Sequence, residues 1–372
     1  MTLKPLAGVC VLDFTALPPG GACTVMLADL GADIIRVESP AQKGKTSLVI
    51  GQVPLSRGKR SITLDLRNPA SSEVLLRLAP TIDVVVENAK PGSMEARGFG
   101  YRQARARNPR IVWCAITGFG QNGPNADHAG HDLSYVAHSG LLGALAPELP
   151  WHPGTMLAVP AGAQSAVIGI QAALLQRTRT GDGAFLDISL TEAAGWFLTC
   201  GINPLTATPY RIPTTPDRRL YACADGRYVA VASAEPRTWA ALCEGLGVPE
   251  LKETLHKGES AAATMQALAR IFLTRSALEW VDRLAAAGAA VTLLNRASEL
   301  LDDPQVRARG SVVECAGVPV PASPIRITSP DGQHSGTATG APHAVGQDTA
   351  EVLSAAGFSV VEIAALTQAG LI

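Results

Sequence analysis

Apolar residues gather in compact blocks along the first 120 positions of the chain. These blocks occupy residues 9–14, 33–38, 62–66, 83–88 and 110–117, and segments with helical spacing lie between some of them, at 21–32 and 71–79. Alternating strands and helices are typical of a parallel sheet with helices on both faces. Strands that are buried on both faces are continuously apolar, as these are. The pattern therefore predicts an α/β fold.

Local signals refine this pattern. Asn68 and Pro69 precede the segment 71–79 and predict a helix start, with an asparagine N-cap followed by proline at the first helical position. Residues 162–179 predict a mostly buried helix, 180–183 a turn and 185–190 a further strand.

A second region follows a segment rich in proline and threonine at 203–216, which we interpret as a linker. Two strand-like runs within 220–233 flank Asp225 and Gly226, a pair that favours a hairpin turn. Helical segments follow as far as residue 315, and 316–346 is again rich in glycine and proline. Two helical segments, 349–357 and 360–370, close the chain. We expect domain boundaries near residues 200 and 320.

Length and composition narrow the protein class. The chain has 372 residues, which suggests about two domains. Hydrophobic residues make up 47% and charged residues 17%, as in globular proteins. The net charge of −1 implies no broad basic face, so we expect no nucleic-acid partner. We see no signal peptide, and we expect no apolar run of about 20 residues that would span a bilayer.

The cysteines indicate a reducing compartment. They are odd in number, scattered and embedded in apolar runs, which suits reduced core thiols in the cytoplasm better than a disulfide framework. Their positions are Cys10, Cys23, Cys114, Cys200, Cys223, Cys243 and Cys315.

Familiar cofactor and nucleophile motifs are missing. The segment ALPPGG (16–21) lies between a strand and a helix, where dinucleotide enzymes carry GxGxxG, but the spacing is absent. The phosphate-binding GxxxxGK[ST], the GxSxG elbow, HExxH and CxxC are also absent. His128 and His131 form an HxxH pair that no metal-spaced cysteine or carboxylate cluster accompanies, so we predict no metal site.

The segment AGHDLSYVAHSG (129–140) holds the best candidate for acid–base chemistry. The imidazole of His131 would titrate near neutral pH, which suits proton transfer. The alternative is a histidine that simply packs in a loop. Asp132 either orients that imidazole or caps a following helix. We interpret His138 and His152 as structural or surface residues.

Nine segments add a resemblance that single residues do not carry. They are LADLGADIIRVESP (27–40), RGKRSITLDL (57–66), DVVVENAKPGSMEARGFG (83–100), ITGFGQNGP (116–124), AGHDLSYVAHSG (129–140), GIQAALLQRTRTGDG (169–183), YACADGRYVAVASAEP (221–236), DDPQVRARG (302–310) and GQDTAEVLSAAG (346–357). In this order, over nearly the whole chain, they resemble the family III CoA-transferases, or CaiB/BaiF family, and within it the α-methylacyl-CoA racemase branch.

The resemblance implies a Rossmann-like parallel-sheet large domain, a smaller α+β domain, and two subunits interlocked like chain links. It implies a large domain at 1–200, a linker at 201–219, a small domain at 220–316 and a return to the large domain at 317–372.

The resemblance also implies a ligand, coenzyme A, as part of an acyl-CoA thioester substrate and with no covalently bound cofactor. Arginine offers charge-assisted, bidentate hydrogen bonds to phosphates. The residues that the resemblance brings to CoA are Arg36, Arg57, Lys59 and Arg60. Asn88, Lys90 and Arg97 are further candidates because they follow a strand end, where ligands of open parallel sheets usually bind. The alternative for the RGKR segment is an ordinary solvated turn.

The GHD tripeptide points to the racemase branch. There the histidine matching His131 is one of two bases that flank the carbon α to the thioester. The glutamate matching Glu235 hydrogen-bonds that histidine, and the partner subunit can supply it. A carboxylate beside an imidazole fixes its tautomer and supports its cation. The alternative for Glu235 is a surface carboxylate.

The sequence departs from the family at the second base. The family carries an aspartate there, which serves as the second base in racemases and as the nucleophile in CoA-transferases. The segment 154–169 contains no aspartate or glutamate, and the aligned residue is Val159, or Ala158 under another gap placement. Thr155 stands at the asparagine-like position before it. Neither valine nor alanine carries a proton or attacks a carbonyl.

Three interpretations remain open. His131 acts as the sole base at an acyl-CoA α-carbon, with Asp132, Asp127 or a water replacing the lost acid. Alternatively, the chain is a non-catalytic subunit that pairs with a catalytic homologue. In the third interpretation it binds CoA thioesters without turnover. A homodimer is the default expectation, and a heteromer is the alternative.

Overall fold

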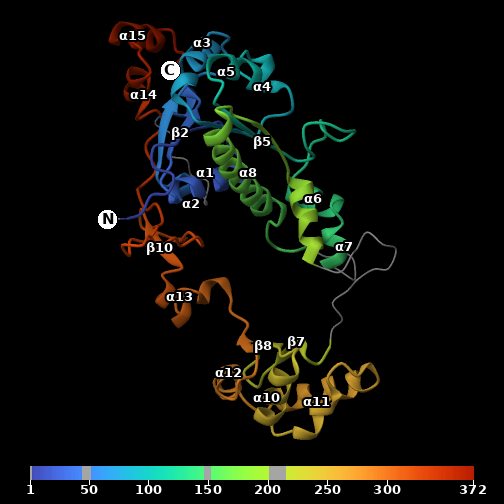
Figure 1. Ribbon diagram of the computed structural model, residues 1–372. Helices are drawn as coiled ribbons and strands as arrows, with labels where there is room; N and C mark the ends of the chain where they lie inside the picture. Colours follow the sequence, from blue (N-terminus) through green and yellow to red (C-terminus); the bar gives the residue numbers. More distant parts are fainter. Residues whose placement is uncertain (1, 44–51, 146–151, 201–214) are drawn as a thin grey trace. The chain divides into compact units, whose positions relative to one another are not determined.

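The computed structural model describes residues 2–43, 52–145, 152–200 and 215–372. The chain divides into two compact units (Figure 1). The larger comprises Met1–Pro209 with Ala308–Ile372, and the smaller comprises Tyr210–Arg307. The larger unit thus takes segments from both ends of the sequence.

The two predicted boundaries of the small domain need correction. Strand β10 (Val312–Cys315) pairs with β11 (Val318–Pro321) in an antiparallel hairpin, and the Cys315 thiol lies 3.6 Å from the carbonyl oxygen of Gly340. These contacts join residues 308–316 to the larger unit rather than to the smaller one. Strand β7 (Arg218–Ala222) begins inside the predicted linker, and the rest of that linker, 201–214, lies outside the described residues.

A parallel sheet of six strands forms the centre of the larger unit. Its strands run in the order β3-β2-β1-β4-β5-β6, and every neighbouring pair is parallel. This is the strand order of the Rossmann fold. The strands are β1 (Cys10–Asp13), β2 (Asp33–Glu38), β3 (Lys59–Thr63), β4 (Val84–Glu87), β5 (Val112–Thr117) and β6 (Phe185–Ser189). The predicted α/β class with a parallel sheet is confirmed.

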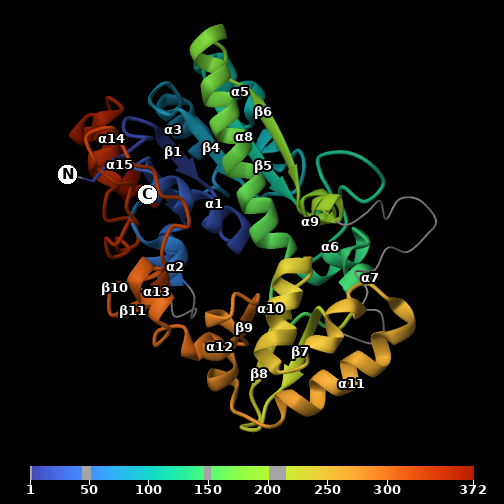
Figure 2. The ribbon, with the colours of Figure 1, turned by 60° about the horizontal axis from the view of Figure 1, so that its bottom comes forward.

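Helices cover both faces of this sheet. On one face, α1 (Pro18–Asp29) and α8 (Ala158–Thr180) pack against each other and over the strands (Figure 2). The other face is covered by α3 (Ser71–Leu78), α5 (Tyr101–Arg107), α14 (Thr349–Ala355) and α15 (Val360–Gln368). Val84 and Val86 belong to the first core and Val85 to the second, which explains the continuous apolar run.

Two predicted helix starts differ from the structure. Helix α3 begins at Ser71 with Ala70 as its N-cap, because the Asn68 side chain instead accepts the Ala70 N–H at 3.0 Å in a preceding turn. Helix α8 begins at Ala158, one turn before the predicted residue 162.

The composition of α8 also changes one expectation. Its most apolar 18-residue window has a mean hydropathy of 1.4, so by length and composition it could cross a membrane, although no such run was expected. Half of that window is buried, and the helix packs on α1, β5 and β6. It therefore behaves as a core helix of the larger unit.

The smaller unit combines a three-stranded antiparallel sheet with helices. The strands β7, β8 (Tyr228–Ala232) and β9 (Val291–Leu293) pack on α10 (Pro236–Leu246), α11 (Ala261–Phe272) and α12 (Ala277–Ala286). The predicted turn joins β7 to β8, with Gly226 at φ +75°. Trp239, Phe272 and Trp280 fill its core.

The remaining α-helices of the described residues are short. They are α2 (Gln52–Ser56), α4 (Ser93–Ala96), α6 (Asp132–His138), α7 (Leu141–Leu145), α9 (Leu190–Gly195) and α13 (Pro304–Arg309).

Candidate functional site

A cavity of about 840 Å³ opens in the larger unit where β1, β4 and β5 end. The strand order reverses between β1 and β4, and ligands of open parallel sheets bind in the crevice at such a point. The volume lies within the usual range for small-molecule sites. The lining residues include Leu17, Pro18, Asn88, Lys90, Thr117, His128, His131, Asp132, Tyr135, His152, Thr155, Met156 and Val159.

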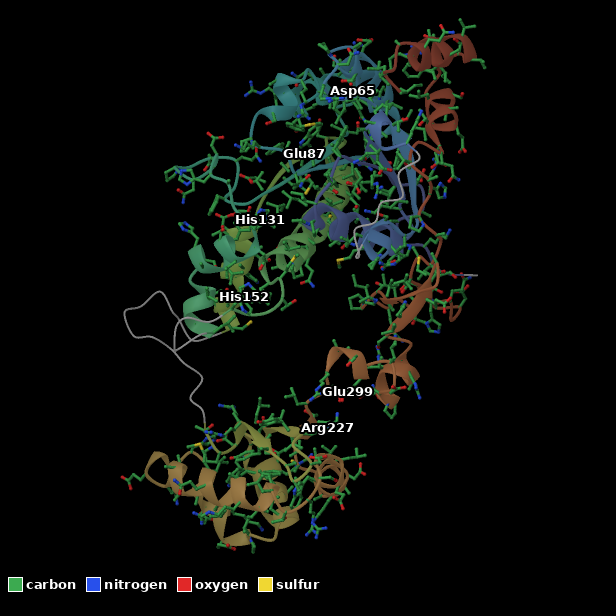
Figure 3. All side chains as sticks on the ribbon, turned by 180° about the vertical axis from the view of Figure 1, so that it is seen from behind. Asp65, Glu87, His131, His152, Arg227 and Glu299 are labelled. Carbon is green, nitrogen blue, oxygen red and sulfur yellow. The ribbon has the colours of Figure 1, made fainter. Side chains whose placement is uncertain are left out.

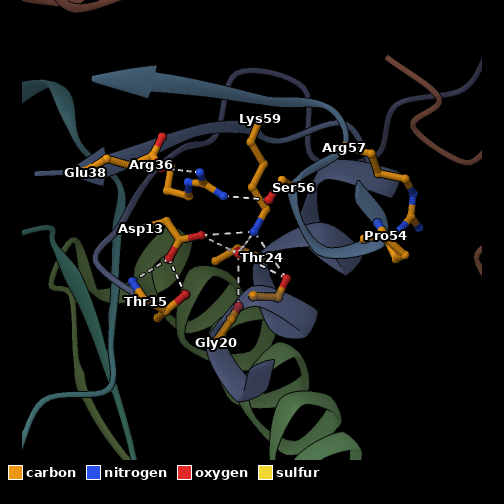
Figure 4. Close-up of polar contacts among 11 residues, drawn as sticks. Asp13, Thr15, Gly20, Thr24, Arg36, Glu38, Pro54, Ser56, Arg57 and Lys59 are labelled. Atoms are coloured by element: carbon orange, nitrogen blue, oxygen red, sulfur yellow. Dashed lines mark hydrogen bonds and ion pairs between the residues drawn. The ribbon is translucent and has the colours of Figure 1, made fainter. Parts of the chain in front are cut away.

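The turn from β1 to α1 forms one wall of this cavity through Leu17, Pro18 and Pro19. The backbone N–H and hydroxyl of Thr15 both donate to Asp13 Oδ1, at 2.8 and 2.5 Å (Figure 4). A Cβ on Gly20 would lie 2.0 Å from the Thr15 methyl group, so only glycine permits this close approach. The ALPPGG segment thus shapes an apolar wall rather than a dinucleotide site.

A buried ion pair between Lys59 and Asp13 holds the same turn from the protein interior. Lys59 Nζ donates to Asp13 Oδ2 at 3.1 Å, to Thr24 Oγ1 at 2.6 Å and to the Gly21 carbonyl at 3.2 Å (Figure 4). The Lys59 side chain is 2% exposed, and burial lowers its pKa. Its ammonium group is therefore occupied inside the protein.

Arg57 is buried in a similar way, with its side chain 5% exposed and Nη2 2.7 Å from Asp29 Oδ2. Neither Arg57 nor Lys59 lines the cavity. Both side chains are buried against protein partners, and their contact with CoA phosphates stays a prediction.

Arg36 and Arg60 are less buried. Arg36 donates to Ser56 Oγ and pairs with Glu38, and its side chain is 18% exposed. Arg60 pairs with Asp33 at 3.0 Å and with Glu351 at 2.9 Å. Neither residue lines the cavity, and neither does the exposed Arg97. Their contact with CoA stays a prediction. Of the further candidates, Asn88 and Lys90 do line it.

The cavity brings His131 together with Val159, the position that the sequence analysis aligned with the family's aspartate. His131 is exposed and immediately precedes α6, and its N–H lies 3.4 Å from Ser134 Oγ. Val159 and Thr155 line the same cavity, whereas Ala158 is fully buried and does not. Of the two alignments left open by the sequence, the one through Val159 therefore places a side chain at the site.

Asp132 holds the start of α8. Its Oδ1 accepts the Val159 N–H at 2.8 Å, and both of its oxygens accept the Leu157 N–H, at 3.1 and 3.0 Å. Negatively charged side chains stabilise helix N-termini through such bonds. Burial, followed by the nearby Asp132 charge, raises the pKa of Tyr135. Asp132 thus takes the capping role, and it caps a helix that begins 26 residues later.

Other polar groups at the cavity were not anticipated. His152 lines it, with Nδ1 accepting the Gly154 N–H at 2.9 Å, although the sequence indicated a structural or surface residue. Thr117 Oγ1 is buried without a hydrogen-bond partner among the described residues. His138 lies outside the lining, with Nε2 3.4 Å from Asn125. The signal missed for Thr117 was the end of β5, since residues at the ends of parallel strands gather at one edge, whereas His152 follows no strand.

Glu235 belongs to the smaller unit. It is exposed and precedes α10, and its Oε2 accepts a hydrogen bond from the Thr238 hydroxyl at 3.0 Å. Its pairing with His131 stays a prediction. Within the described ranges, no three side chains of metal-binding type cluster together.

Residues 6–349 of the chain match a family model described as CoA-transferase family III. The chain belongs to this family. It is 30% identical to an α-methylacyl-CoA racemase of Homo sapiens, over 96% of this chain and 95% of that one. It is also 31% identical to an acetyl-CoA:oxalate CoA-transferase of Acetobacter aceti, over 89% and 91% of the two chains.

Solved structures agree with this membership of CoA-transferase family III. The protein Rv3272 from Mycobacterium tuberculosis superposes with a TM-score of 0.81 at 29% identity, over 94% of this chain and 99% of that one. A CaiB/BaiF family protein from Brucella suis also gives 0.81 at 28% identity, over 96% and 100%. The family resemblance seen in the nine sequence segments is thus confirmed.

Proposed function

We propose that this chain binds an acyl-CoA thioester and removes the proton on its α-carbon with His131 as the base. The observation that carries the proposal is the cavity at the sheet's switch point, which His131 and Val159 both line. Family III relatives with racemase and CoA-transferase names support the substrate class.

The chemistry needs one base and a place for negative charge. The thioester carbonyl makes the α-proton removable, because the electron pair left on carbon delocalises onto the carbonyl oxygen. An imidazole accepts that proton near neutral pH. Hydrogen-bond donors stabilise the resulting enolate oxygen. Thr117 lines the cavity, and its buried hydroxyl, which has no hydrogen-bond partner among the described residues, is the donor that we propose for this oxygen.

A single base limits the outcome. Asp132 is the carboxylate among the described lining residues, and its oxygens accept α8 amides. Asp127 is exposed and lies outside the lining. We therefore assign no replacement acid from these two, and His131 or a water returns the proton. The reactions open to a single base are α-proton exchange, isomerisation, elimination or slow epimerisation.

Val159 favours a second candidate function. A valine cannot form the acyl anhydride that CoA transfer through this position requires. The chain would then be a non-catalytic subunit beside a catalytic homologue, or a CoA-thioester binding protein without turnover. In both cases CoA enters as part of the ligand, and no cofactor is bound covalently.

The proposal extends to assembly and location. We propose an interlocked homodimer in which Glu235 of one copy approaches His131 of the other, with a heteromer as the alternative. We also propose a cytoplasmic location, because the scattered cysteines suit a reducing compartment.

Proton exchange in deuterated water tests the reaction. The purified protein is incubated with a 2-methylacyl-CoA, and loss of the α-proton signal is followed by NMR. We expect exchange in the wild type and at least about 100-fold less in His131→Ala, as removal of a general base predicts. His138→Ala is the matched control, because His138 lies outside the cavity lining.

Two results would contradict the proposal. Undiminished exchange in His131→Ala excludes His131 as the base. Tight CoA binding by calorimetry, with no exchange for any acyl-CoA tested, replaces the enzyme by the binding protein. Co-purification with a catalytic homologue would support the subunit instead.

A further inference from the structure

Glu87 is a buried carboxyl group at the edge of the cavity that the proposed chemistry does not use. It is the last residue of β4 and is 6% exposed. The next four residues, 88–91, all line the cavity, but Glu87 itself does not. Val85 lies in the core beneath α3 and α5, and side chains alternate along a strand, so Glu87 points to that same face. Figure 3 marks Glu87 and His131 in the larger unit.

The carboxylate holds the backbone of the cavity wall. Glu87 Oε2 accepts the Ala89 N–H at 2.6 Å, at the point where the chain leaves the sheet. Glu95, on α4, is the charged group whose negative charge raises the pKa of Glu87. Glu87 thus acts on the cavity wall through its hydrogen bond to the Ala89 backbone.

We infer that Glu87 is a positioning residue, whose ionised carboxylate fixes the 88–91 wall and so makes acyl-CoA affinity depend on pH. This inference rests on the proposed function, since it takes CoA as the ligand of the cavity. Asn88 and Lys90, which the wall carries, are the groups it would hold in place.

The titration falls in the physiological range. The pKa of Glu87 is raised to about 7: burial raises it most, the hydrogen bond from the Ala89 N–H lowers it, and the nearby Glu95 charge raises it. Above pH 7 the carboxylate accepts a charge-assisted bond, which is about twice as strong as a neutral one. Below pH 7 the neutral acid holds the wall less firmly. CoA binding should therefore weaken as the pH falls through 7.

Calorimetry with coenzyme A at pH 6, 7 and 8 tests the inference on the wild type and Glu87→Gln. The phosphomonoester of CoA titrates near pH 6, but it does so for both proteins, so the ratio of their Kd values removes that effect. A loss of about 1 kcal/mol in one hydrogen bond corresponds to about fivefold in Kd. We expect the wild type to bind about fivefold tighter than Glu87→Gln at pH 8 and equally well at pH 6.

Two neighbouring variants sharpen this experiment. Glu95→Gln removes a charge that raises the pKa of Glu87, so the midpoint of the wild-type change should move to lower pH. Glu73→Gln alters an exposed carboxylate on α3 and should leave the profile unchanged.

Thermal unfolding checks the buried titration independently of the ligand. Burial favours the protonated form, so the folded wild type loses stability as the pH rises from about 4.5 towards 7. Glu87→Gln should therefore raise the Tm at pH 8 and leave it nearly unchanged at pH 5. This measurement also shows whether the variant is folded.

The outcomes separate the two proposals. A Kd ratio that is constant from pH 6 to 8, with CoA bound by both proteins, overturns the role of Glu87 alone. A wild type that binds no CoA at any pH overturns the proposed function and this inference with it.

Discussion

At the scale of one residue, the proposed chemistry depends on Val159. It lines the cavity with His131, and its backbone N–H is held by Asp132. A carboxylate at this position would supply a second proton-transfer group in the same cavity. We therefore expect Val159→Asp to epimerise a single stereoisomer of a 2-methylacyl-CoA about 100-fold faster than the wild type.

Val159→Asn is the control for this change, because it has nearly the same shape as aspartate and does not ionise. Chiral chromatography of the recovered acyl group measures the rate. An aspartate variant that is no faster than the asparagine variant would show that position 159 does not face the reacting carbon.

Lys59 shows how sequence context can leave a side chain's partner hidden. The RGKR segment has the composition of a solvated turn or a phosphate site. Asp13, however, is 46 residues away in sequence and meets Lys59 in the interior. No local pattern reveals a partner at that separation. The sequence could predict Val159 and His131 as neighbours only through a family resemblance, since nothing between them specifies the α8 approach.

Breaking the Lys59 pair should destabilise the fold. Lys59→Met leaves Asp13 as an uncompensated charge that is 0% exposed, and removing one partner of a buried pair costs about 3–5 kcal/mol. Urea unfolding at pH 7.5 measures the change in the free energy of unfolding. The double variant Lys59→Met with Asp13→Leu should lose less than the sum of the two single variants. Additive losses would argue against the pair.

At the scale of one element, helix α8 differs from its sequence prediction in burial and in its first turn. Its apolar composition predicted a mostly buried helix. The structure confirms the helix, but only half of its most apolar window is buried. The predicted start at residue 162 missed the first turn, because the group that caps this turn comes from Asp132 rather than from the residues just before the helix. The strands were easier to predict, since burial on both faces leaves a direct apolar signal.

Removing the cap should therefore unwind the start of α8. Asp132→Ala loses three hydrogen-bond contacts to Leu157 and Val159, and loss of an N-cap costs about 1–2 kcal/mol. Asp132→Asn keeps an acceptor and should cost less. Amide exchange at residues 157–161 locates the effect. Unchanged protection there in Asp132→Ala would show that the cap does not hold this turn.

The whole molecule depends on segments that are distant in sequence. Helices α14 and α15 close the face of the sheet that α3 and α5 leave partly covered, and Leu371 and Ile372 are buried in the same core. The family resemblance predicted this return of the chain, whereas hydrophobic patterning indicated only a pair of terminal helices. Patterning shows which faces are apolar but not which element covers them.

The proposed homodimer gives a prediction at this scale. Helix α8 exposes Ile168 by 67% and Leu175 by 57%, seven residues apart on one face. If a second copy covers this face, Ile168→Glu with Leu175→Glu should weaken association at least 100-fold, since each such side chain contributes about 1.5–3 kcal/mol when buried. Native mass spectrometry would then show a monomer of 38.6 kDa in place of a dimer.

Val360→Glu with Val361→Glu is the control, because it makes the same change on exposed positions of α15 and should leave the dimer intact. A dimer that survives the α8 changes but not the α15 changes would move the interface to the C-terminal helices.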